Sequence, residues 1–166
     1  IMNEKRRLLG MTLDELKGVA FEAGLPGYAA KQMADWLYKK KVTSIAAMTN
    51  IASAKRALLE KNFEVGAVPP SDLMKSVDGT IKYLYPAGPG NFVESVYIPT
   101  EDRATLCVSS QVGCKMNCLF CMTGKQGFTK NLSANEILNQ IQSLPETEEL
   151  TNIVFMGMGE PLDNVD

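Results

Sequence analysis

The chain has 166 residues, of which 45% are hydrophobic and 22% charged, and its formal net charge is −2. This balance is typical of a soluble folded protein with one or two domains, and no apolar run reaches the roughly 18 to 20 residues that a membrane span needs. We therefore expect a cytoplasmic protein without a membrane partner. The absence of histidine excludes serine–histidine and cysteine–histidine catalysis, and zinc sites of the mixed cysteine–histidine type.

The first third of the chain is predicted to be helical. Thr12-Leu-Asp-Glu15 is a capping box, and it predicts a helix that ends near Gly24. Leu25-Pro-Gly27 turns the chain into a second helix, and a third helix is predicted over residues 53–62. The side chains expected to face inward are Ala30, Met33 and Leu37 in the second helix, and Ala54, Ala57 and Leu58 in the third.

This helical segment is also basic. Residues 1–66 hold eleven Lys and Arg against seven Asp and Glu, whereas residues 67–166 hold six against twelve. A basic segment can be the electrostatic footprint of nucleic-acid binding. It can equally be a solvated helix face, and charge alone leaves both interpretations open.

The middle of the chain is predicted to be β-structure. The run Gly66-Ala-Val-Pro-Pro70 indicates a linker, and Asp78-Gly79 favours a tight hairpin turn. Strands are expected over residues 80–85 and 92–98.

The last third of the chain has the pattern of a βαβ unit. A strand over 104–109 leads into a cysteine-rich loop, Ser133-Ala-Asn-Glu136 begins a second capped helix, and a buried strand over 151–156 leads into Gly157-Met-Gly-Glu-Pro161. The two strands of such a unit are parallel, and ligands gather beyond their carboxyl ends. We therefore expect the cysteine loop and the glycine-rich loop to lie together.

Three cysteines, Cys114, Cys118 and Cys121, lie within eight residues. A structural zinc site needs four ligands, commonly as two Cys-x2-Cys pairs, and the second pair is missing here. An iron–sulfur cubane held by three thiolates would keep one iron open for a small chelating molecule such as S-adenosylmethionine. Glycines at 157 and 159 would let the backbone approach such a ligand closely.

The Cys-x3-Cys-x-Phe-Cys loop resembles the signature of the radical S-adenosylmethionine (SAM) superfamily. The string from Arg103 to Cys114, Gln126-Gly-Phe128 and Gly157-Met-Gly-Glu-Pro161 resemble one family within it, the dual-specificity RNA methyltransferases. That family methylates carbon 2 of an adenosine in 23S ribosomal RNA and in transfer RNA. The resemblance implies these RNAs and an external electron donor as partners.

The resemblance also implies roles for individual residues. Cys114, Cys118 and Cys121 would hold a [4Fe–4S] cluster, which cleaves SAM to a 5′-deoxyadenosyl radical. Phe120 would lie against the cofactor's adenine, and its methionyl part would contact the residues Gly159 and Glu160.

Two further residues match the family's catalytic positions. By pattern alone, Cys107 is a small buried hydrophobe on a strand, and Glu94 is a solvent-facing strand residue. The resemblance instead implies that Glu94 accepts a proton from the base. It also implies that Cys107 resolves a protein–RNA crosslink by forming a disulfide with a methyl-carrying cysteine.

The methyl-carrying cysteine is not among the four cysteines of this chain, so we expect an N-terminal fragment that is inactive alone. The expected fold is α+β followed by α/β. It comprises a helix-hairpin-helix-like RNA-binding domain over 1–66, a β-rich connecting segment with a hairpin over 67–102, and the first βα units of a partial (β/α) barrel over 103–166. Two alternatives stay open, a resistance-type enzyme that methylates carbon 8 and a non-catalytic zinc module that interacts with RNA.

Overall fold

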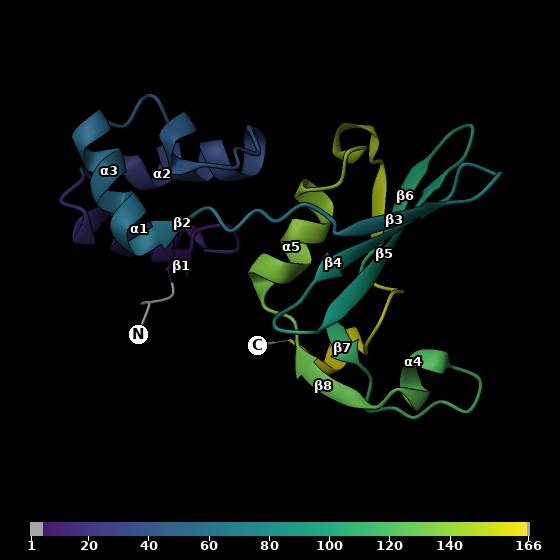
Figure 1. The fold of residues 1–166 in the computed structure, drawn as a ribbon. Helices are drawn as coiled ribbons and strands as arrows, with labels where there is room; N and C mark the ends of the chain where they lie inside the picture. The colour runs from purple at the N-terminus through teal and green to yellow at the C-terminus, as the bar shows by residue number, and fades with distance from the viewer. Residues whose placement is uncertain (1–4, 166) are drawn as a thin grey trace. The chain divides into compact units, whose positions relative to one another are not determined.

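A computed structural model describes residues 5–165 of the chain. Two compact units divide between Ala67 and Val68 (Figure 1). The first is mainly helical, and the second is built around a five-stranded sheet. No helix within the described residues has the length and apolar character needed to cross a membrane.

The first unit begins its helical part as the capping signal predicts. The N-terminal cap of α1 (Leu13–Glu22) is Thr12, whose hydroxyl accepts a hydrogen bond from the Glu15 amide at 3.3 Å while the Glu15 carboxylate accepts one from the Thr12 amide at 2.6 Å. Each side chain therefore satisfies a backbone donor that a helix start leaves free. The helix ends just before Gly24, whose φ of 60° lies in the left-handed region that glycine tolerates.

The remaining elements of this unit follow in chain order. The second predicted helix is α2 (Ala29–Ala34), which continues as the π-helical segment η1 (Asp35–Lys39). Its predicted inner face is confirmed, because Ala30, Met33 and Leu37 are buried. The other elements are η2 (Ile45–Ala47), α3 (Ser53–Asn62), and the parallel strands β1 (Arg6–Arg7) and β2 (Phe63–Glu64).

The predicted inner face of α3 is wrong. The structure buries Leu59 and exposes the three side chains expected inside, Ala54, Ala57 and Leu58. Two basic side chains set this rotation: the Lys55 ammonium donates to the Ala23 carbonyl at 2.9 Å, and the Arg56 guanidinium donates to the Ala46 carbonyl. Long basic side chains can bury their apolar stems along a core while bonding carbonyl groups, so apolar spacing alone misjudged the buried face.

The second unit contains a mixed five-stranded sheet. Its strand order is β3-β4-β5-β6-β9, antiparallel throughout except for the parallel pair β6 and β9. The segment expected to connect two domains therefore shares one sheet with the expected βαβ unit. The strands are β3 (Asp72–Lys75), β4 (Ile81–Pro86), β5 (Phe92–Pro99), β6 (Ala104–Cys107) and β9 (Asn152–Val154).

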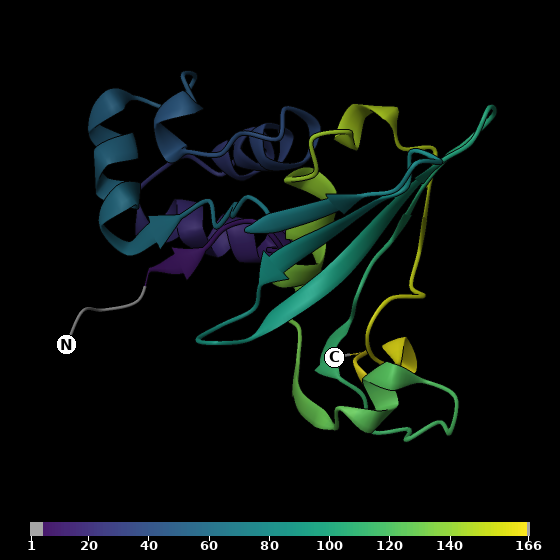
Figure 2. The ribbon, with the colours of Figure 1, turned by 45° about the vertical axis from the view of Figure 1, so that its right-hand side comes forward.

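One face of this sheet is covered by α5 (Ala134–Gln142), as both views show (Figures 1 and 2). The alternation of the strands places tyrosine and aliphatic side chains on this face, where Tyr83 and Tyr85 are almost completely buried. Ile137 and Ile141 of α5 pack against the buried cluster that includes these two tyrosines. The opposite face carries half-buried and exposed side chains and stays open within the described residues.

Three amide side chains of α5 are also buried, and two of them, Asn139 and Gln140, each make a two-way pair with the main chain of one residue. Asn139 accepts from the Val68 amide and donates to the Val68 carbonyl, both at 2.8 Å. Gln140 makes the same two-way pair with Ser109, both bonds at 2.9 Å. Each carboxamide thus replaces the neighbouring strand that a buried main-chain segment would otherwise need.

The strand predicted over 151–156 is shorter and less buried than expected. Only β9 forms, and Ile153, Phe155 and Met156 are 40%, 49% and 80% exposed. β9 is the outermost strand of the sheet order, so it has a neighbour on one side only. An apolar run does not distinguish a central strand from an edge strand.

All but one of the remaining elements lie at the carboxyl ends of β6 and β9. Figure 2 shows η4 (yellow) beside β7, β8 and α4 (green) at this end of the sheet. They are β7 (Gln111–Gly113), which pairs antiparallel with β8 (Phe128–Asn131), together with α4 (Met122–Lys125) and η4 (Pro161–Asp163); η3 (Thr147–Glu149) precedes β9.

Replacing Asn139 by alanine should destabilise the protein, because the buried main chain of Val68 loses both hydrogen bonds. We expect the free energy of unfolding to fall by about 2–3 kcal/mol, measured by urea denaturation. Gln142→Ala on the same helix is the control, since Gln142 makes no side-chain hydrogen bond within the described structure. Equal losses in the two variants would contradict this role for Asn139.

Candidate functional site

The cysteine-loop strand and the glycine-rich loop meet at the carboxyl ends of β6 and β9, as predicted. The Gly157 amide donates to the Val108 carbonyl at 3.0 Å, and the Ser110 amide donates to the Met158 carbonyl at 2.9 Å. These main-chain bonds extend the parallel pairing of β6 and β9 beyond the strands. Residues 108–111 and 157–160 therefore run side by side, joined by main-chain hydrogen bonds, and we call them the paired segments.

Ser109 connects these paired segments to the neighbouring strand β5. Its hydroxyl accepts from the Met158 amide at 2.9 Å and donates to the Glu94 carbonyl. Its own main chain is held by Gln140 of α5. A single buried serine thus fixes three segments of the second unit against one another.

Gln111 is the second buried connection, and its side chain is completely inaccessible to solvent. Its amide oxygen accepts from the Glu160 amide at 2.9 Å. Its amide nitrogen donates to Asn131 on β8 at 2.9 Å and to Asp163 on η4 at 2.8 Å. Both donors and one acceptor position are used, so the side chain has a single favoured orientation.

The two glycines of the Gly-Met-Gly-Glu loop are required by packing within the chain. A Cβ at Gly159 would lie 2.6 Å from the Gln111 Cβ, at a φ of +97° that side chains rarely adopt. A Cβ at Gly157 would lie 2.6 Å from the Val108 carbonyl oxygen. The sequence suggested that glycine is needed here so that the backbone can approach a ligand closely. Packing within the chain is a second reason why both positions require glycine.

The three cysteines occupy a loop between β7 and α4. Cys114 follows β7 and is half-buried, Cys118 is exposed, and Cys121 is half-buried at the start of α4. The loop closes tightly because Gly124 packs against it: a Cβ at Gly124 would lie 3.1 Å from the Cys118 amide nitrogen. All three thiols are free.

Main-chain N–H groups point at two of these sulfurs. The Met116 amide donates to the Cys114 Sγ at 3.5 Å. A hydrogen bond from the Gly124 amide holds the pKa of the Cys121 thiol below its usual value. Such bonds favour the thiolate, which is the form that binds a metal.

Within residues 5–165, no three Cys, Asp or Glu side chains gather closely enough to hold a single metal ion. A cubane places less demand on the loop, because each thiolate bonds a different iron and the sulfurs need not converge on one point. Three free thiols on one short exposed loop therefore fit a cluster better than a single zinc ion.

The residues expected to contact SAM lie in different settings, Phe120 in the cysteine loop and Gly159 and Glu160 beside Gln111. Phe120 is 92% exposed at the loop surface. Gly159 packs on Gln111, as described above. Glu160 is half-buried, and its carboxylate accepts from the Leu162 amide at 3.1 Å, so one oxygen caps η4.

Cys107 and Glu94 share the open face of the sheet. Cys107 lies opposite Val96 in the register of β5 and β6, and Glu94 is two residues before Val96. Side chains in such a diagonal relation lie about 7–8 Å apart. The structure therefore brings the two predicted catalytic residues together, on the face away from α5.

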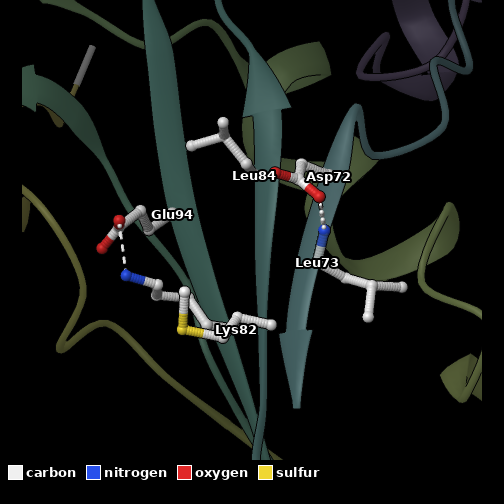
Figure 3. A pocket seen from close by; sticks show the side chains of 6 residues that line it. Asp72, Leu73, Lys82, Leu84 and Glu94 are labelled. Carbon is white, nitrogen blue, oxygen red and sulfur yellow. Dashed lines mark hydrogen bonds and ion pairs between the residues drawn. The ribbon is translucent and has the colours of Figure 1, made fainter.

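Glu94 also lines a shallow pocket on this face, drawn in Figure 3. Its carboxylate lies 3.0 Å from the Lys82 ammonium on β4. The strand pattern indicated only that Glu94 faces solvent, and the structure adds an ion pair that orients its side chain across the pocket.

Sequence reasoning gave no role to Gln111, Ser109 or Gln140. Gln140 did carry a usable signal, since it lies three residues after Ile137 and four before Leu144 and so shares the apolar face of its helix. A polar residue at such a position indicates a buried hydrogen-bonding partner. Ser109 and Gln111 carried only the weaker signal of polar residues continuing a buried strand.

Replacing Gly159 by alanine should destabilise the loop through both its φ and its contact with Gln111. Gly90→Ala is the matched control, because Gly90 has a φ of +70° but a Cβ added there would have no other atom within 4 Å. We expect Gly159→Ala to lower the free energy of unfolding by about 1–3 kcal/mol more than Gly90→Ala. Equal losses in urea denaturation would show that packing on Gln111 adds nothing.

Cys107 should react with iodoacetamide only at higher pH than an ordinary cysteine. Burial raises the pKa of its thiol, and the thiolate is the reacting form. Pulse alkylation with peptide mapping should therefore place its half-maximal rate at higher pH in the folded protein than in urea. A folded midpoint at or below the unfolded one would contradict this effect of burial.

Comparison with known protein families gives two matches. Residues 6–65 match the "Ribosomal RNA large subunit methyltransferase N-terminal domain", and residues 108–166 match the "Radical SAM superfamily". The first match lies in the helical unit, and the second includes the three-cysteine loop and the Gly-Met-Gly-Glu loop.

Individual proteins give the same result. The chain is 82% identical over 165 residues to the "Probable dual-specificity RNA methyltransferase RlmN" of Parabacteroides distasonis, covering 99% of this chain and 48% of that protein. It is 47% identical to the "Dual-specificity RNA methyltransferase RlmN" of Geobacter sulfurreducens, covering 95% and 44%.

A solved structure, a radical SAM methyltransferase from Sphaerobacter thermophilus, superposes with a TM-score of 0.86 at 37% identity, covering 96% of this chain and 49% of the other. The chain spans about half the length of the curated relatives that it matches. The chain therefore belongs to the dual-specificity RNA methyltransferase family of the radical SAM superfamily, and it corresponds to about half of a family member.

Proposed function

We propose that the chain is the N-terminal half of an enzyme that methylates carbon 2 of adenosine in 23S ribosomal RNA and transfer RNA in the cytoplasm. The observation that carries this proposal is the arrangement at one end of the sheet. Gln111 ties the strand that leads into the three-cysteine loop to the Gly-Met-Gly-Glu loop, while Cys107 and Glu94 occupy the open face of the same sheet.

In this proposal the two loops hold the cofactors. Cys114, Cys118 and Cys121 would bind a [4Fe–4S] cluster, and Phe120, Gly159 and Glu160 would contact SAM. Together these cofactors supply a carbon-centred radical, for which an external donor provides the electron. The exposed position of Phe120 leaves its ring free to lie against the adenine of SAM.

The open face would carry the chemistry on the RNA base. Glu94 would accept the proton that leaves carbon 2, with the Lys82 ion pair orienting its carboxylate. Cys107 would then form a disulfide with a methyl-carrying cysteine elsewhere in the full-length protein, as the bond between that cysteine and the methylated base breaks. Burial raises the pKa of the Cys107 thiol, which lowers its thiolate fraction and so slows premature oxidation.

The rest of the chain would supply RNA binding and the scaffold. The helical unit carries the excess of positive charge, which suits the phosphate backbone of a folded RNA. We infer a helix-hairpin-helix-like arrangement for its helices α1 and α2, joined at Leu25-Pro-Gly27. The parallel β6–α5–β9 unit would be the first part of a (β/α) barrel.

The decisive test compares RNA modified by full-length protein with RNA modified by its Cys107→Ala and Cys118→Ala variants, after anaerobic iron–sulfur reconstitution. We expect mass spectrometry to find methyl on carbon 2 with the wild type. Cys118→Ala should lose bound iron and all methylation, whereas Cys107→Ala should keep its iron and accumulate RNA attached to protein, because the crosslink is not resolved. The 166-residue chain alone should give no methylation.

Each alternative has its own result in this experiment. Methyl on carbon 8 would replace the proposed regiochemistry with that of the resistance-type enzymes. A colourless protein that binds stoichiometric zinc and leaves RNA unmodified would overturn catalysis altogether.

A further inference from the structure

One carboxylate oxygen of η4 joins the three-cysteine loop to the Gly-Met-Gly-Glu loop. Asp163 Oδ2 accepts from the Gln111 side-chain amide at 2.8 Å and lies 2.9 Å from the ammonium of Lys115. Lys115 directly follows Cys114, and Gln111 holds the Glu160 amide. Three side chains therefore connect position 115 to position 160 without a gap.

The cysteine-loop end of this connection is held by a second contact. The Lys115 ammonium lies 4.4 Å from the centroid of the Phe128 ring, which follows the loop on β8. A cation above an aromatic face is attracted to it. The ammonium is thus placed by the ring and the carboxylate together, which narrows its accessible rotamers.

How far the ion pair of Lys115 and Asp163 can hold the two loops in place depends on how buried its side chains are. The side chains of Lys115 and Asp163 are 49% and 29% exposed, and an ion pair this accessible contributes little when isolated. Gln111, however, is fully buried and donates to the same oxygen. The carboxylate is therefore fixed from its buried side, and the lysine binds a preorganised acceptor.

We propose that Lys115 and Asp163 are positioning residues that, with Gln111, clamp the three-cysteine loop against the Gly-Met-Gly-Glu loop. Through this loop clamp, a restraint on the conformation of one loop also restrains the conformation of the other. Its consequence for cofactor binding rests on the proposed function, since only then do the two loops hold the cluster and SAM. The clamp itself is a property of the chain without cofactors.

Amide hydrogen exchange in cofactor-free full-length protein tests the clamp. Lys115→Met should raise the exchange rate of the Glu160 amide about threefold, because Asp163 loses the cation that holds it and so fixes the Gln111 side chain less firmly. Asp163→Asn, which keeps an oxygen for Gln111 but loses the charge, should act similarly. The double variant should match Asp163→Asn rather than the product of both effects.

Three controls separate the clamp from general loosening. Lys125→Met removes an exposed lysine of α4 and should leave Glu160 exchange unchanged. Lys115→Arg keeps a cation and should restore slow exchange. The Ser109 amide, which Gln140 holds independently, should exchange at the wild-type rate in every variant.

The outcomes distinguish this inference from the proposed function. Unchanged Glu160 exchange in Lys115→Met, or multiplying effects in the double variant, would overturn the clamp whatever the iron content. With the cluster reconstituted, Lys115→Met should bind SAM about threefold more weakly at wild-type iron content. If the wild type takes up no iron, the proposed function fails while the exchange result still decides the clamp.

Discussion

The carboxamide of Gln111 is buried without access to water and makes three hydrogen bonds, to Glu160, Asn131 and Asp163. A buried amide left unpaired costs about 1–3 kcal/mol, so all three partners are held to positions that satisfy it. These partners belong to the glycine-rich loop, to β8 and to η4. The geometry of the site follows from this one constraint, and Gly159 is glycine because its backbone must pass directly over Gln111.

Helix α5 extends the same principle across the second unit. Its apolar residues pack on the sheet, while Asn139 and Gln140 each pair with the main chain of a single residue. Gln140 holds Ser109, which in turn binds Met158 and the Glu94 carbonyl. The helix that covers the closed face therefore also fixes the strand whose Glu94 side chain lies on the open face. Packing and site geometry depend on the same side chains.

The two faces of the sheet differ because the strands alternate. Residues on the α5 side are tyrosines and aliphatic side chains whose burial stabilises the fold, whereas Cys107, Glu94 and Lys82 share the other side. A shift of one residue in the register of β5 would move Glu94 into the core. The stability of the closed face thus specifies which groups are available for chemistry on the open one.

The sequence alone determined the local features, namely both capping boxes, the inner face of α2, the order of strands around Asp78-Gly79 and the parallel βαβ unit. It also carried the resemblance to the radical SAM superfamily in the spacing of Cys114, Cys118 and Cys121, and the resemblance to one family within it in strings such as Gly157-Met-Gly-Glu-Pro161, because both are local patterns. Long-range hydrogen bonding decided the rest. Lys55 and Arg56 reach carbonyls of other segments and so rotate α3, and β9 is an edge strand because of its place in the sheet. Gln111 connects residues some fifty positions apart, and sequence periodicity carries no information about partners that only the folded chain brings together.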